Sequence, residues 1–379
     1  MNRATRILTR LMRRVAGAAI LLVGMMSLTS CYVLNQGASL LRYQVAAEPI
    51  EKILANSAFA DGSPVSGQTL SFIAEVARIR AFAAEQGLSA SRNYTSLVPT
   101  EREYLADVVN AAAELSFDRH MWWWPFVGRL PYKGYYDPGD ALRLARRLER
   151  RGLDVWVRRV DAFSTLGVLR DPLYEFMTGY DRHTLASLIM HEQAHATLFL
   201  RGNSQFNEEF ASFVGDAGAD AYLHAVGAPD EEIALVHDRT ADRETARSLV
   251  FSLREDLEAV YQSPLTPDRM RTEKAWLIAE WQRNIAENYE SWFRTESFRA
   301  LGDIPVNNAY IDLYVSYTED LGLFRALYDT LDGDLSVFLE ELQVLNNPRR
   351  IRDPASRQLA RRDPKEYVRT RLLDSAGDL

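Results

Sequence analysis

The segment that most constrains this chain is His191-Glu192-Gln193-Ala194-His195, followed by Asn207-Glu208 after eleven intervening residues. Residues four apart on an α-helix share one face, so the two histidines can hold one metal ion between them. Zinc accepts imidazole nitrogens at about 2.0–2.1 Å and completes its shell with a carboxylate and a water. Glu192 neighbours the first histidine and can reach the open side of the metal as a base. The spacing therefore predicts a zinc site that activates water.

The residues around this motif favour a pair of packed helices. Apolar side chains recur at helical spacing around the motif, and Asp181 is a suitable N-cap residue. Residues 202–204 predict a turn, after which a second helix starting near Phe206 brings Glu208 back toward the first helix. Small residues on the second helix allow it to pack closely against the first: Ala211, Ser212 and Gly215. The alternative interpretation is an ordinary amphipathic helix that buries two histidines.

Glu208 and Glu209 both qualify as the third zinc ligand. The pattern Asn-Glu-x-x-Ala at 207–211 resembles the second zinc motif of the gluzincin metallopeptidases, in which the Glu after the Asn binds the metal. This resemblance assigns Glu208 as the ligand, together with His191 and His195. Glu209 is then either a solvated charge or a contact to the amino group of a substrate.

The first thirty residues predict export. Their five arginines come with no acid, and the apolar run from Val15 to Met26 is too short to span a membrane. Residues 28–31, Leu-Thr-Ser-Cys, look like a bacterial lipobox, which implies cleavage before Cys31 and acylation of that residue; a plain signal peptide with an incidental cysteine is the alternative. Cys31 is the only cysteine, so it forms no internal disulfide. More than one acyl chain would anchor the protein stably. Tyr32, by resemblance to Gram-negative lipoproteins, indicates the outer membrane facing the periplasm.

The charge of the chain bears on its partners. The net charge is −8, and removal of residues 1–30 with their five arginines lowers it to −13. An acidic chain without basic clusters argues against a nucleic-acid partner. The remaining length is sufficient for a large core and two lobes.

The order of elements before the motif predicts an α+β fold that is mostly helical. An aromatic, strand-like stretch at 120–140, a helix at 139–151 and a strand at 154–169 precede the motif helix. This order is typical of a zincin-like lobe, in which a small sheet packs on the zinc helix. We expect four regions: a signal peptide (1–30), N-terminal helices and the catalytic lobe (31–225), a helical region completing the cleft (226–345) and a polar, disordered tail (346–379).

Several further residues are candidates for contact with a substrate. Ser164, Thr165, Leu166 and Gly167 would form an edge strand that pairs with a peptide backbone, although a loop is an equal alternative. Asn307 and Asn308 open a helix and are assigned to substrate binding. The same helix carries Tyr314 and Tyr317, and a tyrosine hydroxyl there would donate to the developing oxyanion. Packing is the alternative role for both tyrosines.

The mature chain as a whole resembles the bacterial lipoprotein "predicted aminopeptidase" family, which are proteobacterial zinc peptidases with a lipobox. The matching segments, besides the zinc motif, are Tyr132-Lys133-Gly134-Tyr135, Ala162 to Gly167, Phe206 to Glu208 with Phe210-Ala211, and Asn307-Asn308-Ala309. Family members often carry a cysteine where this chain has Arg129, so no disulfide forms there. The resemblance implies a periplasmic zinc peptidase acting on peptides.

The expected reaction is hydrolysis of a peptide bond by a water that Zn²⁺ activates. Glu192 would take the proton of that water and deliver it to the leaving amine. An aminopeptidase also needs an acid to hold the free amine, for which Glu209 or Asp216 could serve. The alternatives are an endopeptidase acting on envelope proteins and a non-catalytic lipoprotein that binds zinc. The presence of Glu192 argues against the latter, because a structural zinc site does not require it.

Overall fold

The computed structural model describes residues 36–373 with the exception of 91, 125–127, 162–169 and 318–320. It separates into two units, Met1–Ala47 and Glu48–Leu379. In the first unit, residues 36–46 form a helix. None of the helices that the structure describes is long and apolar enough to cross a membrane. The predicted signal peptide and Cys31 lie outside the described residues.

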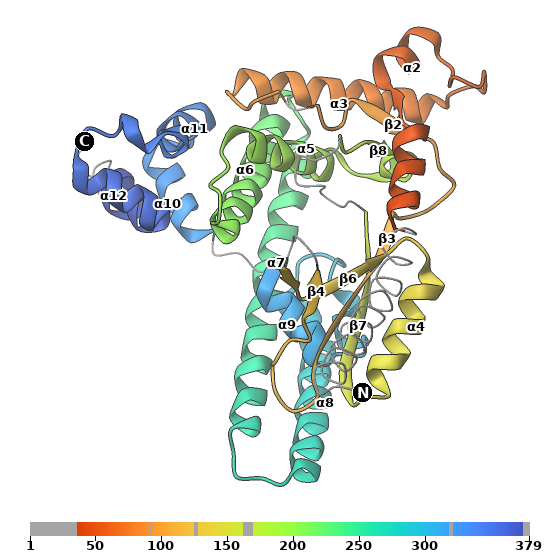
Figure 1. Ribbon diagram of the computed structural model, residues 1–379, viewed down its shortest axis with the longest axis vertical. Coiled ribbons are helices and arrows are strands. Elements are labelled where there is room, and N and C mark those ends of the chain that lie inside the picture. The colour runs from red at the N-terminus through yellow and green to blue at the C-terminus, as the bar shows by residue number, and fades with distance from the viewer. Residues whose placement is uncertain (1–35, 91, 125–127, 162–169, 318–320, 374–379) are drawn as a thin grey trace, which may run out of the picture. The chain divides into compact units, whose positions relative to one another are not determined.

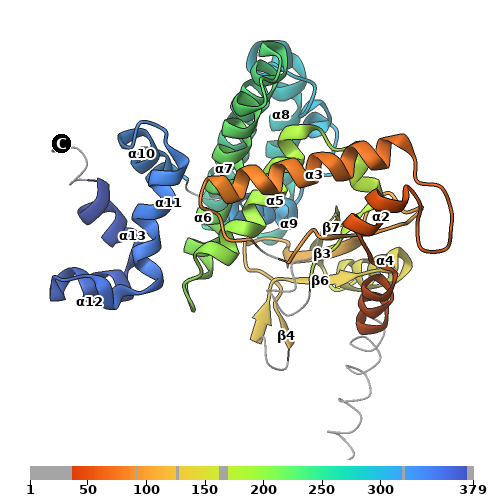
Figure 2. The same ribbon diagram turned by 90° about the horizontal axis from the view of Figure 1, so that it is seen from above.

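The second unit is mostly helical with small sheets, which confirms the predicted fold class (Figures 1 and 2). Its elements before the motif helix are β1 (Glu48–Pro49), α2 (Ile50–Asn56), α3 (Gly67–Glu85), β2 (Ser96–Val98), β3 (Ala106–Ala113), β4 (Trp122–Trp124), β5 (Gly128–Leu130), β6 (Tyr132–Tyr135), α4 (Pro138–Glu149), β7 (Leu153–Val160), β8 (Leu173–Tyr174) and η1 (Glu175–Gly179). The strand–helix–strand order predicted before the motif helix is present as β6, α4 and β7.

The main sheet has the antiparallel order β6–β3–β7, with Val109 of β3 opposite Val157 of β7. Helix α4 and helix α9 (Asn308–Tyr317) pack on this sheet from its two sides (Figure 1). Because both faces are covered, nearly all of β3 is buried, including the polar Asp107 and Asn110 among its alanines and valines. The ring of Trp156 in β7 meets that of Tyr310 in α9 edge-on at 4.8 Å between centroids.

The histidine motif lies on α5 (Arg182–Thr197), and Glu208 lies on α6 (Ser204–Ala225). Asp181 caps α5 as predicted, since its side chain accepts a hydrogen bond from the Thr184 backbone N–H at 2.9 Å. The sequence predicts that a small sheet packs on the motif helix. In the structure, most of the packing on α5 comes instead from the helices α6 and α3.

Two long helices follow, α7 (Asp230–Tyr261) and α8 (Pro267–Trp292), and they pair as an antiparallel hairpin (Figure 1). The turn η2 (Arg299–Gly302) connects them to α9. Their shared core includes Val250, Leu257, Trp281 and Ile285. The first of these helices agrees with the one that the sequence predicts over 229–262, whereas the second ends at Trp292, six residues before the end of the predicted helix 266–298.

We call residues 321–373 the C-terminal helical segment, and its part beyond residue 346 corrects the expectation of a disordered tail. They form α10 (Gly322–Thr330), α11 (Leu335–Gln343), η3 (Val344–Asn346), η4 (Pro348–Arg350), α12 (Pro354–Arg362), α13 (Pro364–Tyr367) and η5 (Val368–Leu373). Ala360, Tyr367 and Val368 are buried, so residues beyond 346 contribute apolar packing that their polar composition hides.

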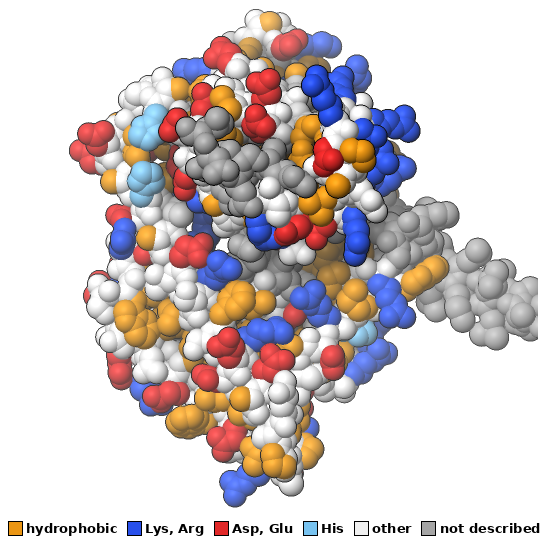
Figure 3. All heavy atoms as spheres, turned by 90° about the vertical axis from the view of Figure 1, so that its left-hand side faces the viewer, with side chains coloured by type: hydrophobic (Ala, Val, Ile, Leu, Met, Phe, Trp, Pro, Cys, Tyr) orange, Lys and Arg blue, Asp and Glu red, His pale blue; other side chains and the backbone are white. Residues whose placement is uncertain are grey.

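The surface of this segment corrects the expectation that the chain has no basic cluster. Figure 3 shows Lys and Arg side chains gathered over the region of α12. The exposed arginines of η4, α12 and the link between them are Arg349, Arg350, Arg352, Arg361 and Arg362. A chain of net charge −8 therefore carries a local positive surface.

Candidate metal centre

The turn between α5 and α6 is fixed by Asn207, which the sequence analysis considers only as part of a motif. Its side-chain Oδ1 accepts from the Leu200 backbone N–H at 2.8 Å, and its Nδ2 donates to the Leu200 carbonyl at 3.0 Å. Asn207 itself is buried. Gly202 in the same turn has φ of +84°. This conformation is unfavourable for residues that carry a Cβ atom, but glycine adopts it readily. Asn207 thus ties the start of α6 to the end of α5 and returns Glu208 toward the histidines.

The two helices approach each other closely at Gly215. A Cβ atom at this position would lie 2.8 Å from the Ser187 carbonyl oxygen and 3.2 Å from the His191 Cβ. Both distances are shorter than ordinary van der Waals contact, so only glycine fits. The predicted role of the small residues on α6 is confirmed at this position, about two turns beyond Glu208.

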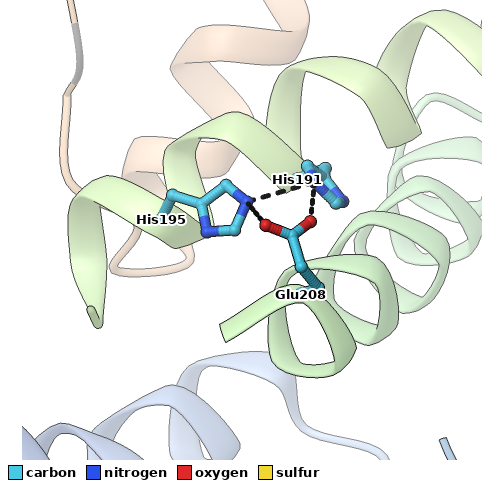
Figure 4. A group of neighbouring side chains, drawn as sticks. All are labelled: His191, His195 and Glu208. Atoms are coloured by element: carbon cyan, nitrogen blue, oxygen red, sulfur yellow. Dashed lines mark hydrogen bonds and ion pairs between the residues drawn. The ribbon is translucent and has the colours of Figure 1, made fainter. Parts of the chain in front are cut away.

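The three predicted ligands come together between α5 and α6 (Figure 4). The Nε2 atoms of His191 and His195 are 3.2 Å apart. Glu208 places Oε2 at 3.7 Å from the His191 Nε2 and Oε1 at 3.7 Å from the His195 Nε2. In tetrahedral zinc sites with bonds of about 2.0–2.2 Å, neighbouring ligand atoms are about 3.3–3.6 Å apart. The group therefore has the spacing that one metal ion requires.

The charges of these residues suit a cation. Burial lowers the pKa of His191 to about 4, helped by the charge of His195 and opposed by that of Glu208. A hydrogen bond from His195 lowers the pKa of Glu208 below its usual value, and burial only partly opposes this. At neutral pH His191 is thus an uncharged imidazole and Glu208 is a carboxylate. The Glu208 side chain is 51 % exposed, which leaves this side of the site open to water.

Glu192 lies next to the ligands in sequence but outside the ligand group. Burial raises the pKa of Glu192 to about 7, and the charges of Asp171 and Glu208 raise it while that of His195 lowers it. A carboxylate with a pKa near neutrality can both accept and return a proton. Asp171, which precedes β8, is a buried acid close to this carboxylate that sequence reasoning did not identify.

Tyr94 is a second residue near Glu192 that no motif indicates. It is buried, and burial followed by the charge of Glu192 raises the pKa of its hydroxyl well above the usual value. Its backbone has φ of +58°, in the left-handed region that non-glycine residues seldom adopt. The Tyr94 N–H donates to the Asp171 carbonyl at 2.8 Å, which holds this conformation. Backbone strain of this kind concentrates at functional sites. The backbone conformation of Tyr94 can be seen in the structure but not in the sequence.

Glu209 does not have the exposure that contact with a substrate amine requires. It is fully buried, accepts from Gln205 at 2.9 Å and forms an ion pair with Lys365. It is neither a solvated charge nor open to a substrate, because the C-terminal helical segment covers it. Asp216 accepts from the Ser187 hydroxyl at 3.1 Å and pairs with Arg243 at 3.4 Å, and 30 % of its side chain is exposed, so its contact with a substrate amine stays a prediction.

The assignment of Asn308 to substrate binding is also corrected. Asn308 is fully buried, and its Nδ2 lies 3.0 Å from the carbonyls at the end of β3 and just after it, those of Ala113, Glu114 and Ser116. Its Oδ1 accepts from the Tyr261 hydroxyl at 2.8 Å. These bonds satisfy the amide and join α9 to the sheet and to α7, so its role is structural.

Asn307 has a similar role at the start of α9. Its Nδ2 donates to the Val155 carbonyl at 2.9 Å, and its Oδ1 accepts from the Tyr310 N–H at 3.0 Å. The first bond ties α9 to β7 and the second caps the helix. The half-buried amide therefore uses both of its ends within the protein.

The remaining candidates stay predictions. Tyr314 packs against the core of α7 and α8, and burial raises its pKa to about 12. The side chain of Tyr317 lies outside the described residues, as do Ser164, Thr165, Leu166 and Gly167.

Comparison with known proteins identifies the family of the chain. No match was found among curated proteins or among solved structures. A family model described as "Putative aminopeptidase" matches residues 31–355, which is most of the chain. With His191, His195 and Glu208 forming a group that could hold a metal ion, the chain belongs to this putative aminopeptidase family.

Proposed function

We propose that this protein is a zinc-dependent peptidase, specifically an aminopeptidase. The observation that carries the proposal is the convergence of three ligand residues: the Nε2 atoms of His191 and His195 are 3.2 Å apart, and each lies 3.7 Å from one carboxylate oxygen of Glu208. Glu192 lies beside this group with its pKa raised to about 7 by burial. Membership in the family supports the peptidase class and favours cleavage at the amino terminus of a peptide.

Each residue has one part in the proposed reaction. When bound, zinc supplies a water whose pKa is lowered to roughly 7 and a positive charge for the carbonyl oxygen. Glu192 accepts the proton of the attacking water and transfers it to the nitrogen of the leaving amine. His191, neutral because burial lowers its pKa, keeps its lone pair available for the metal. Glu208 adds the one negative charge of the ligand set.

A tyrosine hydroxyl is the proposed donor to the oxyanion, and Tyr314 and Tyr317 are the candidates. Replacement of the true donor by Phe should lower kcat by roughly 100-fold or more, with little change in KM. A kcat equal to that of the wild type in both Phe variants would remove tyrosine from the mechanism.

We further propose that the chain is exported and held on the outer membrane, facing the periplasm, by acyl chains on Cys31. One observation supports this: the family match begins at residue 31. Mass spectrometry of the mature protein should find the acylated amino terminus at Cys31. A Cys31→Ser variant should leave the membrane fraction, and its retention there would contradict the anchor.

The central experiment is digestion of a peptide library by the mature protein in detergent, read by mass spectrometry. Loss of single amino-terminal residues is the expected result, abolished by a chelator and restored by Zn²⁺. Cuts within long peptides would instead indicate an endopeptidase. A protein that binds zinc but neither binds a hydroxamate inhibitor nor cleaves any peptide would be a non-catalytic zinc protein.

A further inference from the structure

Two adjacent carboxylates on α6 have opposite environments. Glu208 faces the histidines with 51 % of its side chain exposed, whereas Glu209 is 0 % exposed. Consecutive residues of a helix point about 100° apart. A rotation of α6 by about this angle would exchange the carboxylate that faces the rings, and smaller rotations would turn Glu208 away from them, so the rotation of α6 must be fixed.

Two contacts hold Glu209 in place. Gln205, one turn earlier on α6, donates to its Oε1 at 2.9 Å. Lys365 of α13 forms an ion pair with its Oε2. A fully buried carboxylate is tolerated only when it is paired and hydrogen-bonded. Lys365 is the cation of this pair, and it comes from the far end of the chain.

The C-terminal helical segment contacts both metal-bearing helices, so Lys365 acts from a fixed platform. Asn346 donates to the Thr197 carbonyl in the last turn of α5 at 2.7 Å. Phe324 of α10 and Phe338 of α11 pack against a row of rings on α6, those of Phe206, Phe210 and Phe213. These contacts place the segment along the helix whose rotation matters.

We propose that Lys365 is a positioning residue for the metal centre. By pairing with Glu209 it fixes the rotation of α6, so that Glu208 alone faces His191 and His195 and Glu209 is kept away from the metal. This inference rests on the proposed function to the extent that Glu208 is a zinc ligand. Lys365 lies beyond residues 31–355, which the family model matches.

The test compares two variants that each remove a cation from the same interface, Lys365→Met and Arg325→Met. Arg325 of α10 lies over the rings of Phe213 at 5.0 Å and Tyr328 at 6.0 Å and provides the matched control, because these contacts do not involve Glu209. Zinc affinity is measured by competition with a chelator, and ligand geometry by the visible absorption of the Co²⁺ form. Lys365→Met should lower zinc affinity by about 10- to 100-fold, the range for residues that orient ligands, and shift the Co²⁺ bands. Arg325→Met and Lys365→Arg should leave both unchanged.

Each outcome decides the inference. Wild-type zinc affinity and Co²⁺ spectrum in Lys365→Met would overturn it, whatever the change in Tm. If Lys365→Met does not fold, the double variant Glu209→Gln with Lys365→Met removes both buried charges. Reduced zinc affinity in the double variant would support the positioning role of Lys365, and wild-type zinc affinity would overturn that role. A wild-type protein that binds zinc but cleaves no peptide would refute the peptidase function while leaving the positioning result intact. A wild-type protein that binds no zinc would refute both.

Discussion

The helix pair α5–α6 and the C-terminal helical segment differ in how far their contacts reach along the chain. In the helix pair, His195 and His191 are four residues apart, and Asn207 binds Leu200 seven residues away. The segment reaches the same helices across 149 residues, from Asn346 to Thr197. The short-range region carries the chemical groups, and the long-range region holds the helices that carry them. Variants that separate metal binding from stability can break or sharpen this comparison.

The largest effect is expected when a ligand of the helix pair is removed. His195→Ala should lower activity by on the order of 10⁴-fold or more, as when a member of a catalytic unit is lost. Zinc affinity should fall by more than about 100-fold, beyond the effect of residues that only orient ligands. Metal content after dialysis and peptide cleavage are the measurements. If His195→Ala retains wild-type zinc affinity, the metal is not bound by this helix pair.

The next effect separates the base from the ligands. Glu192→Gln should keep zinc affinity within about threefold and lower kcat by about 10²–10⁴-fold, because the amide cannot accept a proton. The two measurements are zinc competition and initial rates on the best peptide from the library. A variant with normal zinc content and full kcat would remove Glu192 from the reaction.

The helix pair could be predicted from the sequence because its structure is encoded locally. The histidine spacing, the Asp181 cap and the small residues of α6 each act within a few turns of helix. The histidine motif, together with the resemblance of Asn-Glu-x-x-Ala to the gluzincin motif, predicts the group that His191, His195 and Glu208 form.

The long-range contacts could not be predicted in this way. Nothing near Glu209 in the sequence shows that Lys365 pairs with it, and the polar composition after residue 346 indicates disorder rather than helices. Asn308 has the chemistry of a ligand-binding amide, but its three carbonyl partners lie more than 190 residues earlier. Tyr94 belongs to no motif, and only its burial near Glu192 identifies it.

Two buried asparagines provide a matched pair for the third prediction. Asn207→Ala and Asn308→Ala should each lower the free energy of unfolding by about 2–4 kcal/mol, because the first leaves the N–H and C=O of Leu200 without their partner and the second leaves three backbone carbonyls without theirs. Asn207→Ala should also lower zinc affinity, since the α5–α6 turn loses its tie. Asn308→Ala should leave zinc affinity and KM unchanged in the folded fraction. Urea unfolding, zinc competition and peptide kinetics are the measurements. A raised KM in Asn308→Ala would restore its assignment to substrate binding.

The smallest effect compares one helix cap in each region. Asp181 caps α5, and Asp334 caps α11 by accepting from the Ser336 and Val337 N–H groups at 2.9 and 3.1 Å. Loss of a cap costs about 1 kcal/mol, so Asp181→Ala and Asp334→Ala should have similar stability. Asp181 also pairs with Arg239 at 2.9 Å, a half-exposed ion pair that adds at most about 1 kcal/mol.

The pH dependence of these two variants gives a further check. Burial alone would raise the pKa of Asp181, but hydrogen bonds from Thr184 and the charge of Arg239 outweigh it and lower the pKa. Hydrogen bonds from Ser336 and Val337 lower the pKa of Asp334. A carboxyl whose pKa is lower in the folded state stabilises the protein above its unfolded pKa of about 3.9, and this stabilisation is lost as the pH falls through the folded pKa. The stability difference between each variant and the wild type should therefore be constant from about pH 6 to 7 and shrink below about pH 4.

Both variants should keep zinc affinity within about twofold, because fraying of a first turn does not reach the ligands. A tenfold loss of zinc affinity in Asp181→Ala alone would show that α5 transmits strain along its whole length, which would make even the short-range region depend on distant contacts.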